Sequence, residues 1–186
     1  KLLKNQFFKI NIKKNIPHGS GLGGGSSNAA DLLNYFNYRL NLKLSREKKE
    51  NLAKQIGFDV PASLEKKNSF LTGKKGKILR FNKKFELILL IVYPNFVCST
   101  KKIFKKNKRK SLLKQGTFDY IKDKKKLINF LKNENNDLEE AAIKIYPKIK
   151  TIIKYIKQQK GCYLSRITGS GSACIGIFSN MKNAFY

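Results

Sequence analysis

The sequence has 186 residues, of which 41% are hydrophobic, and a formal net charge of +28. This length and apolar content are sufficient for a sizeable core, which excludes a disordered chain and is compatible with one large or two small domains. The longest apolar run, at residues 87–93, is far shorter than the ~20 residues that span a bilayer, so the sequence predicts no membrane partner.

The positive charge comes almost entirely from lysine. Forty residues are basic and 12 are acidic, and only five of the basic residues are arginine, the side chain best suited to reading base edges. Abundant Lys, Asn and Ile are typical of an AT-rich genome, so we interpret the charge as a solvated surface and expect no nucleic-acid partner. A basic RNA-binding module is the alternative. It would need exposed aromatic residues among the lysines, whereas Phe36, Phe85 and Phe178 fall at core-periodic positions.

Cysteine and histidine are scarce. Cys98, Cys162 and Cys174 form no C-x-x-C pair, and His18 is the sole histidine. The sequence therefore predicts neither a zinc site nor a disulfide framework, assigns no side chain as a metal ligand on this ground, and favours a cytoplasmic protein with reduced thiols.

The first elements along the chain are predicted from their hydrophobic period. Residues 7–13 alternate between apolar and polar side chains, which predicts a strand. Apolar residues then recur at helical spacing from about Ser27 to Leu40, and a second helix fits residues 45–56. Ser45 is a suitable N-cap for the second helix, and Gly57 is a suitable stop.

Strands and a basic segment follow. Two short strands flank the glycine turn at residues 73–76, and residues 85–93 are typical of a buried strand. The basic stretch 101–116 is weakly amphipathic, so we expect it at the surface.

The C-terminal part combines helices with a strand pair. Acidic residues favour a helix start at Asn136 or Asp137, and Pro147 can open the next helix, which ends at about Gln159. Residues 162–178 are typical of a strand, a glycine turn and a second strand, and residues 180–186 look like the first turn of another helix. The sequence favours a β-α domain that ends near Arg80, followed by a second α+β unit.

A glycine-rich loop precedes the first predicted helix, in the stretch IPHGSGLGGGSSNAADLL at residues 16–33. Glycine leaves backbone amides uncovered and reaches the positive φ angles that let successive N–H groups point inward. The helix that follows adds its unpaired amides and the positive end of its dipole. The loop is therefore predicted to bind phosphate groups, and Ser26 and Ser27 supply hydroxyls for a phosphate oxygen or a magnesium ion.

Two further stretches are candidates for chemistry. Asp59 lies in the tight loop GFDVP, where a carboxylate beside a phosphate site can accept a proton from an attacking hydroxyl. An aspartate in a turn is more often an ordinary turn residue, and the glycine loop is what favours the catalytic interpretation. The stretch TGSGSAC at residues 168–174 is either a simple hairpin turn or a second set of amides that approaches a substrate phosphate.

These stretches, in this order, resemble the GHMP kinase superfamily over nearly the whole sequence. Residues 16–33 are similar to its ATP loop, and residues 56–64 (IGFDVPASL) are similar to its G-A-D-V-P segment. Residues 136–147 are similar to its N-D-L-E helix, and residues 166–178 are similar to its third glycine motif. The resemblance implies a two-domain α+β fold.

The resemblance also implies where the domains and the site lie. Residues 1–80 would be an ATP-binding domain similar to domain 2 of ribosomal protein S5, and residues 81–186 would be a ferredoxin-like substrate domain. Asp59 would be the base that deprotonates the acceptor hydroxyl. The residues expected to bind the ATP phosphates form one continuous loop: Pro17, His18, Gly19, Ser20, Gly21, Leu22, Gly23, Gly24, Gly25, Ser26 and Ser27. The residues expected on the substrate side are Thr100, with its neighbour Ser99, and Gly169, Ser170 and Gly171.

The implied reaction is phosphoryl transfer from ATP, with Mg²⁺, to a small-molecule alcohol. The resemblance favours a cytidine diphosphate-linked methylerythritol as that alcohol, with homoserine, mevalonate or a sugar as the alternative acceptors. In the family, the catalytic lysine and the cytosine-recognising residues lie upstream of the glycine loop. We therefore expect an internal piece of a longer protein that is not competent by itself. We interpret His18 as a local variant, and Lys14 as a candidate phosphate contact; Lys101 stands where relatives often have proline.

Overall fold

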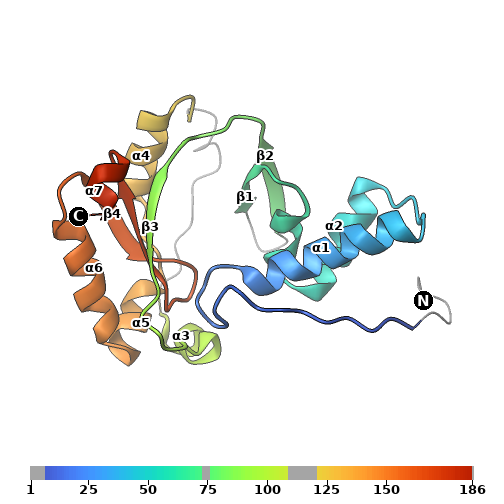
Figure 1. The fold of residues 1–186 in the computed structure, drawn as a ribbon, viewed down its shortest axis with the longest axis horizontal. Coiled ribbons are helices and arrows are strands. Elements are labelled where there is room, and N and C mark those ends of the chain that lie inside the picture. Colours follow the sequence, from blue (N-terminus) through green and yellow to red (C-terminus); the bar gives the residue numbers. More distant parts are fainter. Residues whose placement is uncertain (1–6, 73–75, 109–120, 186) are drawn as a thin grey trace.

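The computed structural model describes residues 7–72, 76–108 and 121–185. In Figure 1, two helices and a two-stranded hairpin form one end of the molecule, and a three-stranded sheet with its covering helices forms the other. This mixture of helices and antiparallel sheets confirms the predicted α+β class. None of the described helices is long and apolar enough to cross a membrane.

The N-terminal half is organised by two helices, α1 (Gly24–Arg39) and α2 (Arg46–Ile56). A short 3₁₀ helix, η1 (Val60–Leu64), packs against both of them. The buried residues of this small core are Ala30, Ala53, Val60 and Leu64. The two helices contribute small buried side chains, Ala30 and Ala53, and η1 contributes the larger Val60 and Leu64.

The predicted helix boundaries hold at α2 and shift at α1. Ser45 caps α2 by accepting a hydrogen bond from a backbone N–H of the first turn, and the helix ends at Gly57 as predicted. The first helix, in contrast, begins at Gly24 rather than near Ser27. Glycine has a low helix propensity, so the sequence predicts that Gly24 and Gly25 belong to the loop. In the structure, Gly23 is left-handed (φ 72°) and the helix begins at the next residue.

The strand predicted at residues 7–13 does not form. The segment is extended and runs beside α1 in Figure 1, but it pairs with no described strand. The ring of Phe8 packs on Phe36, with centroids 4.7 Å apart, while Phe7 is 97% exposed. Alternation selects extended backbone, but a strand also needs a hydrogen-bonded neighbour, and the described residues supply none.

The other predicted strands form. Strands β1 (Asn68–Thr72) and β2 (Lys77–Phe81) pair antiparallel around the predicted turn, whose residues 73–75 lie outside the described part. Strand β3 (Ile88–Val92) is shorter than the predicted 85–93. Strands β4 (Cys162–Ile167) and β5 (Cys174–Phe178) confirm the predicted strand pair, and the sheet order is β3-β5-β4 with all neighbours antiparallel.

Helices α5 (Glu139–Ile145) and α6 (Lys148–Gln158) pack on one another, and α6 lies against β4 and β5; the two helices supply four of the nine described buried residues of the larger core. Gly176 in β5 allows close contact, because a Cβ built there would lie 2.5 Å from the Ile156 side chain of α6. The buried residues of this core are Cys98, Ile103, Ala141, Ala142, Ile149, Ile156, Ile167, Cys174 and Phe178. The short α7 (Met181–Phe185) confirms the expected final helix and contacts β3 and β5.

Two helices were not predicted. Helix α3 (Thr100–Lys106) lies in the basic stretch expected at the surface; its lysines are exposed, but Ile103 is fully buried. Residues 109–116 of that stretch lie outside the described part. Helix α4 (Lys124–Asn133) buries Ile128 and Phe130 and contacts β4. Lysine dominates α3, in which Ile103 is buried, whereas α4 has an apolar face, with Leu127, Ile128, Phe130 and Leu131 among its lysines, that the sequence prediction missed.

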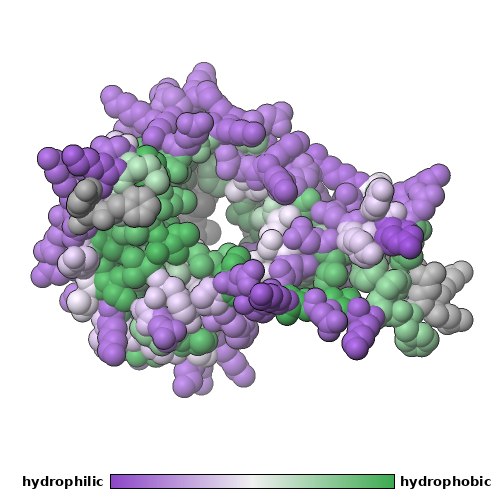
Figure 2. Space-filling view, in the orientation of Figure 1, coloured by the Kyte–Doolittle hydropathy of each residue, from purple (hydrophilic) through white to green (hydrophobic). Residues whose placement is uncertain are grey.

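Hydrophilic side chains cover most of the face seen in Figure 2. A hydrophobic area lies over β3, whose Leu89 and Ile91 side chains are about half exposed, at 50% and 51%. The alternate residues Ile88, Leu90 and Val92 pack against the larger core, so Leu89 and Ile91 lie on the opposite face of the strand, which is left exposed.

Candidate functional site

The glycine loop leads directly into the N-terminus of helix α1, which has no side-chain cap. Gly23 is the N-cap of α1, in the left-handed conformation, and no side chain caps the helix. The first backbone N–H groups of an α-helix have no acceptor within the helix, so they are available to a ligand. Ser26 and Ser27 lie in the same first turns, and Ser27 N–H is already bonded to the Gly23 carbonyl at 2.9 Å. The arrangement fits an anion at the α1 N-terminus.

Four of the five glycines of the loop fall into two groups. A Cβ built at Gly23 or Gly25 would meet no atom within 4 Å, so the space above these residues is open. A Cβ at Gly19 would lie 2.4 Å from the Val97 side chain, and a Cβ at Gly21 would lie 2.1 Å from the Thr168 carbonyl. The first group leaves room for a ligand, and the second allows the loop to pack against the rest of the protein.

The glycine loop rests directly on the third glycine motif. The Ala173 N–H donates to the Ser20 carbonyl at 2.9 Å, and Thr168 Oγ1 donates to the Gly21 carbonyl at 3.1 Å. Ser20 is only 2% exposed, so its part in this structure is to shape the loop, whereas His18 is exposed. The structure thus brings together the predicted nucleotide loop and the motif predicted on the substrate side.

Thr100 and Ser170 also meet. Their hydroxyl oxygens lie 2.9 Å apart, within hydrogen-bond distance, although the residues come from α3 and the third glycine motif. Ser99 caps α3 through its side chain, and its N–H donates to the Tyr146 hydroxyl at 3.0 Å. Gly169 is exposed beside Ser170, whereas Gly171 is buried against Cys98.

The N-D-L-E motif holds the third glycine motif in place, a role that helical patterning alone did not indicate. The Asn136 amide nitrogen donates to the carbonyls of Ile167 and Gly169, at 3.1 and 2.8 Å. Glu139 accepts a hydrogen bond from Ile167 N–H at 2.9 Å. Asn136 Oδ1 also accepts from Leu138 N–H, so the helix begins later than predicted because this residue forms a turn ahead of it.

Asp59 is exposed and is the N-cap of η1. No hydrogen bond or ion pair joins its carboxylate to another residue in the described ranges, which leaves it free to accept a proton. The turn behind it is well anchored, because Val60 and Leu64 belong to the small core and the Leu64 carbonyl accepts a hydrogen bond from Asn34 of α1 at 3.0 Å. Asp59 is thereby attached to the helix that the glycine loop begins.

Lys14 lies near the same helix start. The Asn28 amide is oriented so that both its nitrogen and its oxygen have a partner. Its nitrogen donates to the Gly24 carbonyl and its oxygen accepts from Lys14 Nζ, each at 3.2 Å. The ammonium group of Lys14, the predicted phosphate contact, therefore lies beside the first turns of α1. Among the described residues, no group of three or more His, Cys, Asp or Glu side chains could hold a metal ion.

The buried thiols lie beneath the site and are unsuited to reaction. Burial raises the pKa of Cys98 to about 11, and burial, with smaller contributions from Glu139 and Cys98, raises the pKa of Cys174 to about 12. All three cysteines are free.

Two family models match the sequence. The model described as GHMP kinases N terminal domain matches residues 1–67, and the model described as GHMP kinases C terminal matches residues 112–184. Curated relatives named 4-diphosphocytidyl-2-C-methyl-D-erythritol kinase include those of Pelagibacter ubique, 36% identical over 98% of this chain, and Wolbachia pipientis, 37% identical over 94%. The chain spans 63% and 60% of the lengths of these two relatives.

Solved structures show the same fold. A crystal structure of 4-(cytidine 5′-diphospho)-2C-methyl-D-erythritol kinase matches 92% of this chain and 62% of its own, with a TM-score of 0.67 and 23% identity. A homoserine kinase from Cytophaga hutchinsonii matches 92% of this chain and 60% of its own, with a TM-score of 0.71 and 16% identity. These likenesses agree with the two family models and with the order of the glycine motifs. The chain belongs to the GHMP kinase family.

Proposed function

We propose that this chain carries the nucleotide loop, the catalytic base and part of the acceptor site of a kinase that phosphorylates 4-diphosphocytidyl-2-C-methyl-D-erythritol. The 2-hydroxyl is the acceptor, and the step belongs to the non-mevalonate route to isoprenoids. The names of the curated relatives support the choice of substrate. The observation that carries the proposal is the docking of the glycine loop on the third glycine motif, with the Asp59 turn packed on the same α1 helix.

The nucleotide loop would hold the ATP phosphates at the start of α1. The uncapped N-terminus and the open space above Gly23 and Gly25 fit an anionic group, since side chains there would fill that space. The hydroxyls of Ser26 and Ser27 would contact phosphate oxygens or Mg²⁺, and Lys14 would add a positive charge. Magnesium usually keeps waters and binds substrate phosphates together with few protein ligands, which fits this set of donors. When bound, it would neutralise negative charge on the phosphates.

Asp59 would accept the proton of the acceptor hydroxyl. A carboxylate that is exposed, unpaired among the described residues and fixed at its backbone is suited to this role. Phosphoryl transfer asks little covalent chemistry of the protein beyond orientation and charge neutralisation. The remaining residues therefore need only hold the two substrates in register.

The acceptor would bind on the side formed by Thr100, Gly169 and Ser170. The paired hydroxyls of Thr100 and Ser170 offer donors and acceptors for a polyol or a diphosphate. Gly171 is buried, so we propose that it shapes the turn while Gly169 and Ser170 make the contacts. We further propose that the protein works in the cytoplasm on this small molecule and has no nucleic-acid or membrane partner.

The test is a measurement of ADP formation from Mg-ATP, with the protein encoded by the complete reading frame that contains this sequence. The acceptors compared are 4-diphosphocytidyl-2-C-methyl-D-erythritol, homoserine and mevalonate. Turnover confined to the first acceptor is the expected result. Turnover with homoserine or mevalonate instead would replace the substrate assignment, and ATP binding without turnover on any of the three would leave only the nucleotide loop.

A salt titration distinguishes the proposed kinase from the alternative, an RNA-binding module. Binding to a polyanion weakens steeply as ionic strength rises, because counterions are released from the nucleic acid. We expect Mg-ATP affinity to respond far less than any RNA retention between low and physiological salt. An RNA affinity that survives physiological salt would contradict the proposed absence of a nucleic-acid partner.

A further inference from the structure

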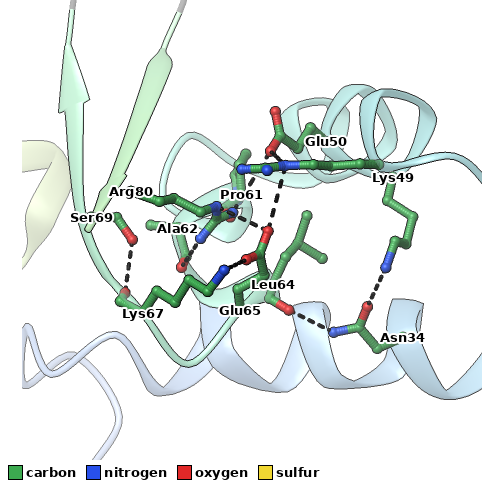
Figure 3. A network of polar contacts seen from close by, with 11 residues as sticks. Asn34, Lys49, Glu50, Pro61, Ala62, Leu64, Glu65, Lys67, Ser69 and Arg80 are labelled. Atoms are coloured by element: carbon green, nitrogen blue, oxygen red, sulfur yellow. Dashed lines mark hydrogen bonds and ion pairs between the residues drawn. The ribbon is translucent and has the colours of Figure 1, made fainter. Parts of the chain in front are cut away.

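Arg80 is a buried cation directed at the turn that follows Asp59. It lies in β2, and its side chain is 5% exposed. Its guanidinium Nη2 donates to the Pro61 carbonyl at 2.8 Å, and Nη1 donates to the Ala62 carbonyl at 3.4 Å (Figure 3). Both carbonyls belong to η1, so one planar group links the hairpin to the turn that begins immediately after Asp59.

Two carboxylates form ion pairs with the guanidinium. Glu65 Oε1 lies 3.1 Å from Arg80 Nε, and Glu50 Oε1 lies 3.8 Å from Nη2. Figure 3 shows the Arg80 side chain between η1 and α2, with Glu50 above it and Glu65 beside it. A guanidinium presents its donors in a fixed fork, so it can bind neighbouring carbonyls and carboxylates at once, whereas a lysine ammonium is a point charge on a flexible stem.

The turn needs such a contact because it is short. Helix η1 has five residues, and Asp59 forms no side-chain cap at its start. On one side, Val60 and Leu64 pack on α1 and α2 through the small core. On the other side, Arg80 binds the carbonyls. Asp59 itself is exposed, so its position depends on these two attachments of the residues that follow it.

We propose that Arg80 is a positioning residue for Asp59: by binding the Pro61 and Ala62 carbonyls, it fixes the turn that presents the carboxylate to the acceptor hydroxyl. This inference rests on the proposed function, in which Asp59 is the base. A displacement of about 1 Å of a catalytic group can cost on the order of 100-fold in rate, so loss of this contact would affect turnover more than nucleotide binding.

The experiment compares Arg80→Met with Arg46→Met in the protein from the complete reading frame. Arg46 is a matched control, because it pairs with the same Glu50 and Glu65 but is 63% exposed and is not bonded to either carbonyl. We expect Arg80→Met to lower kcat by about 10- to 100-fold and to change the KM for Mg-ATP by less than about threefold. Arg46→Met should leave kcat within about twofold of wild type. A normal kcat in Arg80→Met would overturn the proposal.

A double mutant tests whether Arg80 acts through Asp59. Groups that act as one unit are not additive, so Arg80→Met should have no further effect on kcat in an Asp59→Asn background. An equal loss in both backgrounds would show that Arg80 acts independently and would overturn the proposal. Retained turnover in Asp59→Asn alone would instead overturn the proposed function, and this inference with it.

Hydrogen exchange gives a readout that does not depend on activity. In Arg80→Met, amide exchange in residues 59–64 should accelerate by about tenfold or more, with little change in α2 beyond its contacts with the turn. Unchanged exchange in residues 59–64 would contradict the positioning role. If Arg80→Met does not fold, Arg80→Lys replaces it in every arm, and a full kcat in Arg80→Lys would likewise overturn the proposal, because lysine lacks the fork that binds both carbonyls.

Discussion

Thr168 Oγ1 donates a hydrogen bond to the Gly21 carbonyl at 3.1 Å, across a sequence separation of 147 residues. The contact joins the loop expected to hold the ATP phosphates to the motif expected on the acceptor side. It depends on Gly21 having no side chain, since a Cβ there would lie 2.1 Å from the Thr168 carbonyl. One close approach therefore brings the two halves of the proposed site together.

Gly21→Ala should destabilise the fold. The residue has a φ of +77°, which is unfavourable for alanine, and the added carbon would overlap the Thr168 carbonyl. We expect the free energy of unfolding to fall by about 2 kcal/mol or more, measured by chemical denaturation. Gly25→Ala is the matched control, because its site is open and helical; it should change the unfolding free energy by no more than about 1 kcal/mol. Equal effects would refute this division of the loop glycines.

Gly25→Val should weaken ATP binding without unfolding the protein. The valine side chain would enter the open space above the α1 N-terminus, where the phosphates are proposed to bind. Gly24 is a less suitable site for this test, because a Cβ there would lie 3.3 Å from the Ile16 side chain. We expect the Kd for Mg-ATP, measured by titration calorimetry, to rise by about tenfold or more, which corresponds to about 1.4 kcal/mol. An unchanged Kd would mean that the loop is only structural.

Asp59→Asn should remove turnover while preserving nucleotide binding. An amide is nearly isosteric with the carboxylate but cannot accept the proton, so kcat should fall by about 100- to 10,000-fold. The Kd for ATP should stay within a few-fold, because a general base acts in the transition state. Steady-state kinetics and calorimetry on the same preparation check both parts. Near-normal kcat would remove Asp59 from the mechanism.

Glu65 should make the fold sensitive to acid. Burial raises the pKa of its carboxyl, but the hydrogen bond from Lys67 and the charges of Arg80, Arg46 and Lys67 outweigh this, so the folded-state pKa lies below its ordinary value of 4.5. The stabilisation is therefore complete well above pH 4.5 and is lost as the pH falls through the folded-state pKa. The Tm difference between wild type and Glu65→Gln should shrink as the pH is lowered below 4.5. A pH-independent difference would contradict this account.

The buried thiols should make the fold sensitive to alkali. The pKa of Cys98 is raised to about 11 and that of Cys174 to about 12, from an ordinary value of 9.0. Unfolded chains lose these protons near pH 9, while the folded protein keeps them, so stability should fall as the pH rises above 9. At pH 8 the two buried thiols should react with a disulfide reagent more slowly than the half-buried Cys162. Rapid reaction of all three would contradict the burial.

Local chemistry made some elements predictable. Ser45 and Gly57 mark the ends of α2, and Pro147 marks the start of α6, because caps and proline act within a few residues. The glycine loop was recognised because its composition reflects a backbone requirement. The strand at residues 7–13 failed because pairing depends on a neighbour that local alternation does not specify.

Local sequence patterns did not predict the contacts that assemble the site. Arg80 looked like one cation among many in a basic chain, and only the fold shows that it is buried against η1. Asn136 looked like a helix start, whereas its amide binds two carbonyls of a distant motif. Because the four motifs resemble those of one family, the sequence predicted that they occur together. The contacts and distances between the motifs could be obtained only from the structure.

The bond from Ala173 N–H to the Ser20 carbonyl has a consequence for how the protein can diversify. The glycine loop lies on the third glycine motif, so a larger side chain on either contacting surface would collide with the other. If the third glycine motif binds the acceptor as proposed, substitutions there that admit another alcohol must preserve the surface on which the glycine loop lies. New acceptor specificity is therefore more accessible through the exposed rim, at Thr100 and Gly169, than through the buried turn at Gly171 and Ser172.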